Sequence, residues 1–478
     1  MGFKESAIKG VRWTSFSTII LAITQLITIA VLARFLAKSD FGLMAIVMVV
    51  KGFADLFMDL GITVAILHKQ NITTNEYSSL YWMNMAIGFV IYFILCLITP
   101  FIASFYQEME LLKLIPLMCL AIPISSIGRQ QKTMLQKELY FKDIAIVDII
   151  SSVLSLCIAI YFAMTDWGIY ALVFSNLMRY TLSNIIYFFI GIKTGPVECH
   201  FQFKETMPFF KIGMYNTGGQ VINYFSTSFD VLIIGKLLGS DSLGIYNLAK
   251  ELVIKPSSVV APIITRVVTP LFSKMQNEKK TLLTYFFSMQ KIIANINAYI
   301  YLGIFILAHP IVNLYYGKGY DTCVPIVGIL ALYYMLREYG QPMSMVCIAK
   351  GRTDIDMWWN VLMLFIFPAF VTIGALESIK AVSISLLLLN IVMFYPGWYI
   401  YARRLLGINF FSYYGSLIST FKLFLLPTLV TLIFVHNVDF SSIWLFISGG
   451  LIFSLFVFIL FYFFNRNSFQ MILKLVSK

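Results

Sequence analysis

Three charged residues stand in a stretch that otherwise has the composition of a membrane-spanning helix. The stretch is VMVVKGFADLFMDLGI, Val47 to Ile62, and it carries Lys51, Asp55 and Asp59. Their spacing by four places them along one slowly drifting stripe of a helix, which can face a neighbour or water while the other sides face lipid. Lysine and arginine in such a place are the groups that hold phosphate.

Other charges stand at a similar depth in the hydrophobic stretches of the chain. The candidate anion-binding cations are Lys51, Arg179, Lys250, Lys255, Lys291 and Arg337; Lys422 is a further cation, and the carboxylates interpreted as counter-ions or coupling sites are Asp55, Asp59, Asp230, Glu251 and Glu338. Each charge facing lipid at a helix centre is unfavourable by about 2.5 to 3.5 kcal/mol. We therefore expect a shared aqueous cavity, and the excess of cations predicts an anionic substrate.

Local pairing is an alternative interpretation of the same charges. Lys51 and Asp55 are four residues apart and could form an ion pair within one helix, and Arg337 could pair with a carboxylate across the bundle. Both interpretations stay open at this point.

Uncharged polar residues indicate a second part of the substrate. The stretch YNTGGQVINYFSTSFD carries Asn216, Gln220 and Asn223, and Gln25 lies midway in the first hydrophobic stretch. Amide side chains suit sugar hydroxyls, although they could equally join helices by hydrogen bonds.

The elements that must position these residues are membrane-spanning helices. The chain has 478 residues, is 59% hydrophobic and 12% charged, and has a mean hydropathy of +0.84, which excludes an ordinary soluble domain. Apolar runs of about twenty residues, the length that crosses the bilayer as a helix, recur along the whole chain. We count about fourteen such runs, so an all-α integral membrane protein is predicted. The runs begin near Trp13, Phe41, Leu80, Leu112, Ile144, Gly168, Phe210, Leu243, Leu282, Cys323, Met357, Val382, Tyr414 and Ile443.

The distribution of lysine and arginine predicts the orientation of the chain. They collect in alternate connections, which indicates that both termini are cytoplasmic and accounts for most of the net charge of +12 without nucleic acid. The six cysteines and four histidines are dispersed, so no metal site, cofactor or catalytic residue is predicted. The connections are too short for a soluble domain.

An internal repeat divides the chain. ARFLAKSDFGLM (Ala33 to Met44) and GKLLGSDSLGIY (Gly235 to Tyr246) align with Gly42 over Gly244. The two stretches are six predicted spans apart, an even number, so the halves have the same orientation. We predict an N-lobe of six helices at 1–195, a C-lobe of six at 196–406, and two extra helices with a cytoplasmic tail at 407–478.

Several stretches together identify a family resemblance. The chain resembles the Wzx-type and teichuronic-acid-exporter-like polysaccharide exporters of the multidrug/oligosaccharidyl-lipid/polysaccharide flippase superfamily. The stretches that carry the resemblance are ARFLAKSDFGLMA, DLGITVAILH, GRQQKTMLQKELYFKDIAIVD, DVLIIGKLLGSDSLGIYNLAKEL, VTPLFSKMQ and KGRTDID. It extends over nearly the whole chain.

The resemblance implies a two-lobed, MATE-like bundle in the bacterial cytoplasmic (inner) membrane that works by alternating access. It implies that the protein is not an enzyme. It implies a flippase that moves polyprenyl-pyrophosphate-linked oligosaccharide repeat units from the cytoplasmic to the outer leaflet for O-antigen, capsule or exopolysaccharide assembly. Membrane lipids are expected partners, while coupling to H+ or Na+ and contact with a polymerase or export machinery stay open. The alternatives are a MATE-like cation-coupled drug antiporter, which favours carboxylates, and a membrane polymerase or ligase, which needs longer outer loops.

Overall fold

Every regular element that the computed structural model describes is a helix. The structure describes residues 3–59, 63, 66, 67, 69, 72–438 and 441–464, and these ranges contain no strand. Eleven segments within them are long and apolar enough to cross a membrane. The predicted all-α membrane architecture is confirmed; the count of fourteen spans and the two lobes of six remain predictions.

The chain forms two compact units, Met1–Gly244 and Ile245–Lys478, and each is described by itself. The division falls inside α9 (Phe203–Lys274), whose backbone departs from helical geometry at Gly239, with φ of 78°. Two helices meet there, inside the second copy of the repeated stretch. A residue with a side chain rarely adopts this conformation, which explains the glycine.

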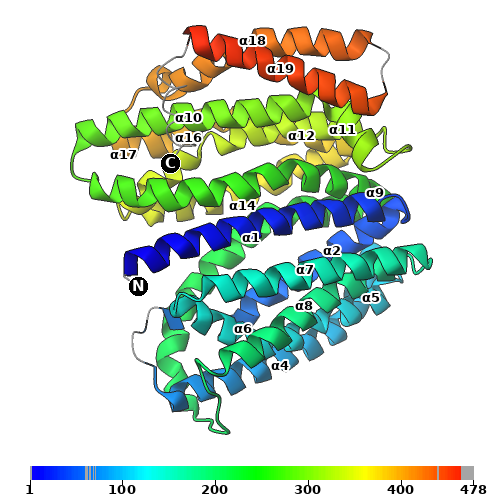
Figure 1. Ribbon diagram of the computed structural model, residues 1–478, viewed down its shortest axis with the longest axis vertical. Coiled ribbons are helices and arrows are strands. Elements are labelled where there is room, and N and C mark those ends of the chain that lie inside the picture. Colours follow the sequence, from blue (N-terminus) through cyan, green and yellow to red (C-terminus); the bar gives the residue numbers. More distant parts are fainter. Residues whose placement is uncertain are drawn as a thin grey trace. The chain divides into compact units, whose positions relative to one another are not determined.

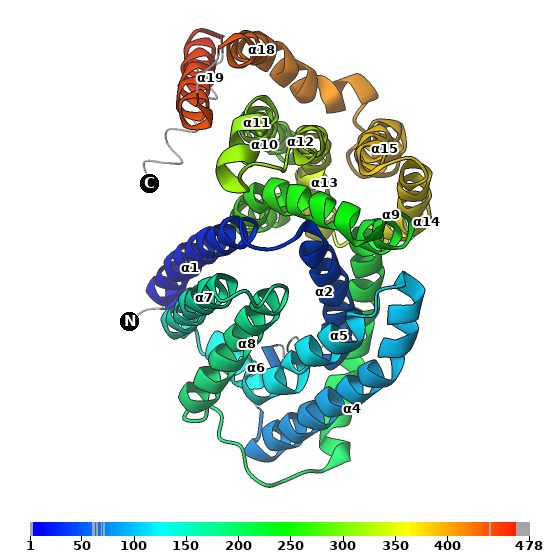
Figure 2. The same ribbon diagram turned by 90° about the vertical axis from the view of Figure 1, so that its right-hand side faces the viewer.

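The first unit contains α1 and α2, α4 to α8, and the beginning of α9. Helix α1 packs along α7, which packs along α8, and α8 packs along α6 (Figures 1 and 2). Helices α2, α5 and α6 all contact α4. The bounds are α1 Phe3–Leu32, α2 Lys38–Asp59, α4 Thr74–Tyr106, α5 Leu111–Cys119, α6 Ala121–Lys137, α7 Phe141–Met164 and α8 Tyr170–Gly191.

Local sequence signals set the ends of α4. Thr73 accepts a hydrogen bond from the Glu76 backbone N–H, and the Glu76 carboxylate accepts one from the Thr73 backbone N–H. This capping box satisfies backbone donors that the first turn leaves unpaired. At the other end Gln107 adopts a left-handed conformation, which terminates the helix.

The two stretches of the internal repeat touch through their glycines. A Cβ atom on Gly42 would lie 1.9 Å from the Ser240 carbonyl oxygen, and one on Gly244 would lie 1.8 Å from the Lys38 carbonyl oxygen. Lys38 and Ser240 occupy matching positions in the two stretches. The contact is therefore reciprocal, as a two-fold relation between the stretches requires.

Side chains of α4 fix the segment that joins α8 to α9. Ser78 accepts a hydrogen bond from the Glu198 backbone N–H, and the indole of Trp82 donates to the Glu198 carbonyl. Ser79 accepts from the Gln202 backbone N–H and donates to the Glu205 carboxylate at 2.6 Å. An irregular connection is thus held by specific hydrogen bonds.

The second unit contains the end of α9 and the remaining helices. Helix α10 packs on α12 and on α18, while α14 packs on α15 and α18 on α19 (Figure 2). The bounds are α10 Lys279–Ile306, α11 Ala308–Tyr315, α12 Cys323–Glu338, α13 Gln341–Ala349, α14 Thr353–Ala375, α15 Ile379–Val392, α16 Phe394–Gly397, the π-helix η1 Trp398–Arg403, α17 Arg404–Leu406, α18 Phe410–Asn437 and α19 Ser442–Phe464.

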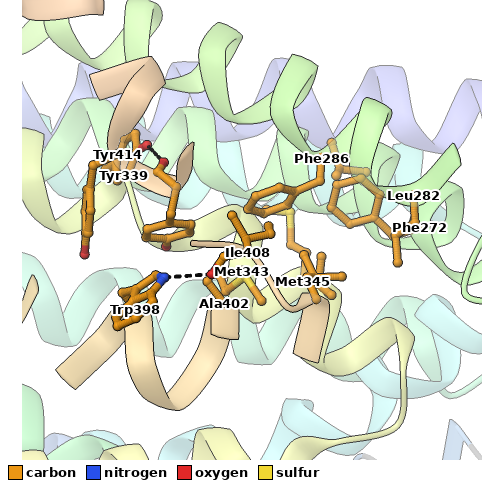
Figure 3. Packing of buried hydrophobic residues seen from close by; sticks show 14 of the residues in the cluster. Phe272, Leu282, Phe286, Tyr339, Met343, Met345, Trp398, Ala402, Ile408 and Tyr414 are labelled. Atoms are coloured by element: carbon orange, nitrogen blue, oxygen red, sulfur yellow. Dashed lines mark hydrogen bonds between the residues drawn. The ribbon is translucent and has the colours of Figure 1, made fainter. Parts of the chain in front are cut away.

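A core rich in aromatic residues joins α18 to the rest of the second unit. Tyr339 donates its hydroxyl hydrogen to the Tyr413 carbonyl, and the Tyr339 and Tyr414 rings stack. Figure 3 shows the Trp398 indole directed at Ile408, whose carbonyl accepts its N–H at 2.9 Å. Hydroxyl and indole donors are thus satisfied inside an apolar core.

Candidate functional site

The charged stripe of α2 begins with a buried ion pair. Lys51 is 2% exposed, and its Nζ lies 2.5 Å from Asp55 Oδ2 one turn later. The local pairing that the spacing allowed therefore exists. The side chain of Asp59, the third residue of the stripe, lies outside the described residues.

Arg129 of α6 is the second partner of Asp55. Its Nη2 lies 3.1 Å from Asp55 Oδ1, and its Nη1 donates to the Asp55 backbone carbonyl at 3.4 Å. Each carboxylate oxygen thus holds one cation. The sequence interpretation left Arg129 out of the site because it counted this residue among the charges that mark the cytoplasmic side.

Helix α8 adds a third cation and an aromatic ring. Lys51 Nζ lies 4.1 Å from the centre of the Tyr180 ring, and the Arg179 guanidinium carbon lies 5.2 Å from it. Cations over an aromatic face gain about 0.5 to 2 kcal/mol, more when desolvated. Both cations therefore lie against the Tyr180 ring, which stabilises them there.

Tyr224 of α9 contacts α2 next to the charged residues. Its hydroxyl donates to the Val49 carbonyl at 2.8 Å, and a Cβ atom on Gly52 would lie 2.4 Å from the Tyr224 hydroxyl oxygen. Gly52 therefore permits α9 to approach the charged part of α2 closely.

Positive charge exceeds negative charge in this cluster. Lys51, Arg129 and Arg179 are cationic, and Asp55 is the carboxylate that the described contacts place among them. We call these four residues with Tyr180 the α2–α6–α8 cluster. By contrast, Lys132 of α6 is compensated by Asp148 at 3.1 Å, whose other oxygen accepts from the Tyr187 hydroxyl.

In the second unit the predicted residues fall into smaller groups. Lys255 Nζ lies 2.8 Å from Glu251 Oε2, one turn earlier on α9, and Lys250 precedes this pair. Lys291 is half-buried on α10. Of these three lysines, Lys255 forms an ion pair with Glu251 on the same helix.

Arg337 and Glu338, neighbours at the end of α12, differ in their surroundings. Arg337 is exposed, with its guanidinium carbon 5.6 Å from the centre of the Tyr334 ring. Glu338 is 8% exposed and accepts hydrogen bonds from the side chains of Gln341 and Ser257. Neutral side-chain donors thus bind the Glu338 carboxylate, next to the Arg337 guanidinium.

The predicted sugar-facing residues are placed only in part. Gln25, Gln220 and Asn223 are exposed, whereas the side chain of Asn216 lies outside the described residues. Asp230 is 2% exposed, and one of its oxygens accepts from the Val231 backbone N–H at 2.9 Å. The described residues contain no group of three or more His, Cys, Asp or Glu that could hold a metal ion.

The sequence matches known proteins over most of its length. Residues 31–325 match the family described as "Polysaccharide biosynthesis protein". The chain is 30% identical to the teichuronic acid biosynthesis protein TuaB of Bacillus subtilis (strain 168), over 87% of this chain and 86% of that protein. It is 29% identical to the lipopolysaccharide biosynthesis protein WzxC of Escherichia coli (strain K12), over 90% and 87% of the two chains.

Two solved structures share the fold. The lipid II flippase MurJ, in an inward closed conformation, aligns with a TM-score of 0.75 at 16% identity, over 96% of this chain and 99% of that one. An inward-facing multidrug resistance MATE family transporter of the MOP superfamily aligns with a TM-score of 0.62 at 13% identity, over 80% and 96%. The expected MATE-like fold is confirmed.

Proposed function

This chain belongs to the polysaccharide biosynthesis protein family, within the MOP superfamily, and on that premise we propose that it is a flippase for lipid-linked oligosaccharides. Its cargo is a polyprenyl-pyrophosphate-linked repeat unit, which it moves from the cytoplasmic to the outer leaflet by alternating access. The product serves the assembly of O-antigen, capsule, exopolysaccharide or a similar cell-surface polysaccharide.

The observation that carries this proposal is the surplus of cations in the α2–α6–α8 cluster. Lys51 and Arg129 stand on segments that are long and apolar enough to cross a membrane. Arg179 stands on α8, which packs against α6 and α7. A pyrophosphate brings the negative charge that this surplus lacks, and Lys and Arg bind its oxygens by charge-assisted hydrogen bonds.

We propose that the remaining predicted residues also contact the cargo. In the second unit these are the cations Lys250, Lys255, Lys291 and Arg337, with Glu251 and Glu338 as counter-ions or coupling sites, and Asp230 of the first unit has the same role as the two glutamates. Gln25, Asn216, Gln220 and Asn223 face the sugars. The exposure of Gln25, Gln220 and Asn223 supports this assignment, because amides buried in interhelical contacts would be covered.

We further propose the membrane arrangement that the sequence predicts. The lobes are 1–195 and 196–406, followed by the helix pair and tail at 407–478, and the reciprocal glycine contact between the repeated stretches supports two related halves. The protein is multi-pass in the bacterial cytoplasmic membrane with both termini in the cytoplasm. Membrane lipids are proposed as partners. Coupling of transport to H+ or Na+, and contact with a polymerase or export machinery, are further proposals.

A drug antiporter is the second candidate, because a multidrug transporter shares the fold. Organic cations call for carboxylates and aromatic rings in the cavity. The one carboxylate placed in the α2–α6–α8 cluster is already held by two cations, which disfavours a cationic cargo. An enzyme is disfavoured by the transport names and folds among the similar proteins.

The test is to delete the gene in its own cell and locate the lipid-linked glycan. We expect the glycan to accumulate where a glycan-cleaving enzyme added to the outer face cannot reach it, and wild-type protein to restore access. Arg179→Gln should reduce export about tenfold or more, since one charge-assisted contact is lost. Lys422→Gln, which neutralises an exposed cation of α18, is the matched control and should restore export fully.

Two outcomes would count against the proposal. Accumulation of the glycan on the outer face would show that flipping still occurs without the protein and that a later step is blocked. Unchanged export in Lys250→Ala or Arg337→Ala would remove that residue from the proposed lining while leaving the α2–α6–α8 cluster.

A further inference from the structure

Asp55 occupies the place in the α2–α6–α8 cluster that an incoming anion would need. Its two oxygens lie 2.5 Å from Lys51 Nζ and 3.1 Å from Arg129 Nη2. A phosphate group binds the same two partners through the same kind of oxygen atom. The carboxylate and a phosphate therefore cannot both hold these cations in this geometry.

The burial of the three side chains shows how an anion would have to enter. The Lys51 side chain is 3% exposed, whereas those of Asp55 and Arg129 are each 26% exposed. The ammonium group has the Tyr180 ring 4.1 Å away and the Asp55 carboxylate against it. A phosphate that approaches from the open part of the cluster meets Asp55 and Arg129 first and reaches Lys51 after Asp55 turns away.

The Asp55 side chain is partly exposed, at 26%, and has a polar neighbour on the same face of α2. Gly52, three residues earlier, carries no side chain, and the Tyr224 hydroxyl fills the space beside it. The Lys51 and Arg129 side chains hold the Asp55 carboxylate through contacts to its two oxygens. A change in the Asp55 side-chain rotamer is therefore the movement that would release both cations.

We infer that Asp55 is a resident anion that occupies Lys51 and Arg129 while the site is empty and is displaced from both by a phosphate of the cargo. This inference rests on the proposed flippase function. It makes Asp55 a positioning residue that acts through the two cations, and it assigns Arg129 to phosphate binding.

Such an exchange solves a problem that any empty cationic site has inside a membrane protein. Several uncompensated cations at low dielectric are strongly unfavourable. A resident carboxylate compensates part of the charge before the cargo binds, and the cargo compensates it afterwards. Because one anion replaces another, the cargo is held less tightly than three bare cations would hold it, which allows it to be released on the other side.

A purely structural role for Asp55 makes the opposite prediction. If Asp55 served only to keep buried Lys51 in place, its loss would weaken or leave unchanged the binding of an anion. If Asp55 competes with the cargo, its loss tightens binding. The sign of the change in affinity therefore separates the two roles.

The experiment measures binding of a sugar-free polyprenyl pyrophosphate to the purified full-length protein in detergent at low salt. We expect Asp55→Asn to bind at least tenfold more tightly than wild type, Asp55→Glu to bind like wild type, and Arg129→Gln to bind at least tenfold more weakly. Asp148→Asn, which removes the carboxylate of the separate Lys132 pair, is the control and should bind like wild type. In cells, Asp55→Asn should slow export despite its tighter binding.

Folding of the variants is handled by a second comparison. If Asp55→Asn does not fold, Lys51→Met/Asp55→Asn is compared with Lys51→Met, because both lack the buried ammonium group. The double variant should bind the pyrophosphate at least tenfold more tightly, since Arg129 is then free of its carboxylate.

The outcomes separate this inference from the proposed function. Equal or weaker binding by the folded Asp55→Asn, with wild type binding and Arg129→Gln weakened, overturns the exchange alone. If wild type and every variant fail to bind the pyrophosphate, the proposed cargo and the exchange are both wrong.

Discussion

Gly42 and Gly244 each lie against the backbone of the other's stretch, with the Ser240 carbonyl facing one and the Lys38 carbonyl facing the other. Any side chain at either position would overlap a carbonyl oxygen rather than a flexible side chain. The two helices can therefore approach this closely only because both positions are glycine.

Alanine at either glycine should separate the two stretches. We expect Gly42→Ala and Gly244→Ala to lower export and melting temperature to a similar degree, because the contact is reciprocal. Gly415→Ala is the matched control: nothing lies within 4 Å of that Cβ position in α18, and replacing a helical glycine adds up to about 1 kcal/mol of helix propensity. Tolerance of alanine at one of the paired glycines, but not at the other, would argue against a symmetric contact.

The segment before α9 should loosen when Ser79 is lost. Ser79→Ala leaves the Gln202 backbone N–H and the Glu205 carboxylate without this partner, at an expected cost of about 1 to 3 kcal/mol. Trypsin should then cleave the purified protein about tenfold faster at Lys193 or Lys204. Ser151→Ala is the control, because the buried Ser151 hydroxyl has no partner; equal cleavage in both variants would contradict the expected role.

The two aspartates of the KGRTDID stretch should behave differently. Asp356 accepts hydrogen bonds from Tyr401 at 2.8 Å and Ser344 at 3.1 Å, so Asp356→Ala should destabilise the protein by about 1 to 2 kcal/mol. Asp354 pairs with Arg352 in an exposed contact, and exposed pairs add little. Thermal unfolding should show a lower melting temperature for Asp356→Ala and no change for Asp354→Ala; the reverse order would refute this assignment.

Tyr339→Phe should weaken the attachment of α18. The variant removes the hydrogen bond to the Tyr413 carbonyl and the contact with Ser416 but keeps the ring, so a loss of about 1 kcal/mol is expected. Thr428→Val removes a buried hydroxyl of the same helix that has no partner and should leave the melting temperature unchanged or raise it. Equal melting temperatures for Tyr339→Phe and wild type would show that these bonds do not hold α18.

Hydropathy was sufficient to predict most of the fold, because lipid-facing helices need long apolar stretches. It predicted separate spans near Phe210 and Leu243, and the structure places the break between them at Gly239. It did not predict that the stretch beginning near Leu112 forms two helices, α5 and α6, that meet at Leu120. The point at which one helix ends and the next begins inside an apolar stretch depends on the packing of the helices. Hydrophobic periodicity does not indicate that point.

The charged site was predictable in composition but not in pairing. The spacing of Lys51 and Asp55 allowed an ion pair, because residues four apart share a helix face, but it did not decide between that pair and a shared cavity. Arg129 is 74 residues from Asp55, and only the packing of α6 near α2 brings them together. The sign that could have revealed Arg129 is its place in a polar run, GRQQK, inside what is otherwise a spanning helix.

The burial of Trp398 has an optical consequence. Of the seven tryptophans, all within the described residues, Trp398 is the one with a buried side chain. A quencher dissolved in detergent or lipid should therefore extinguish emission from the others and leave a residual, blue-shifted signal from Trp398. The Trp398 indole is hydrogen-bonded to the Ile408 carbonyl, just before α18 begins. The remaining Trp398 fluorescence should therefore report whether α18 and α19 stay packed on the rest of the second unit.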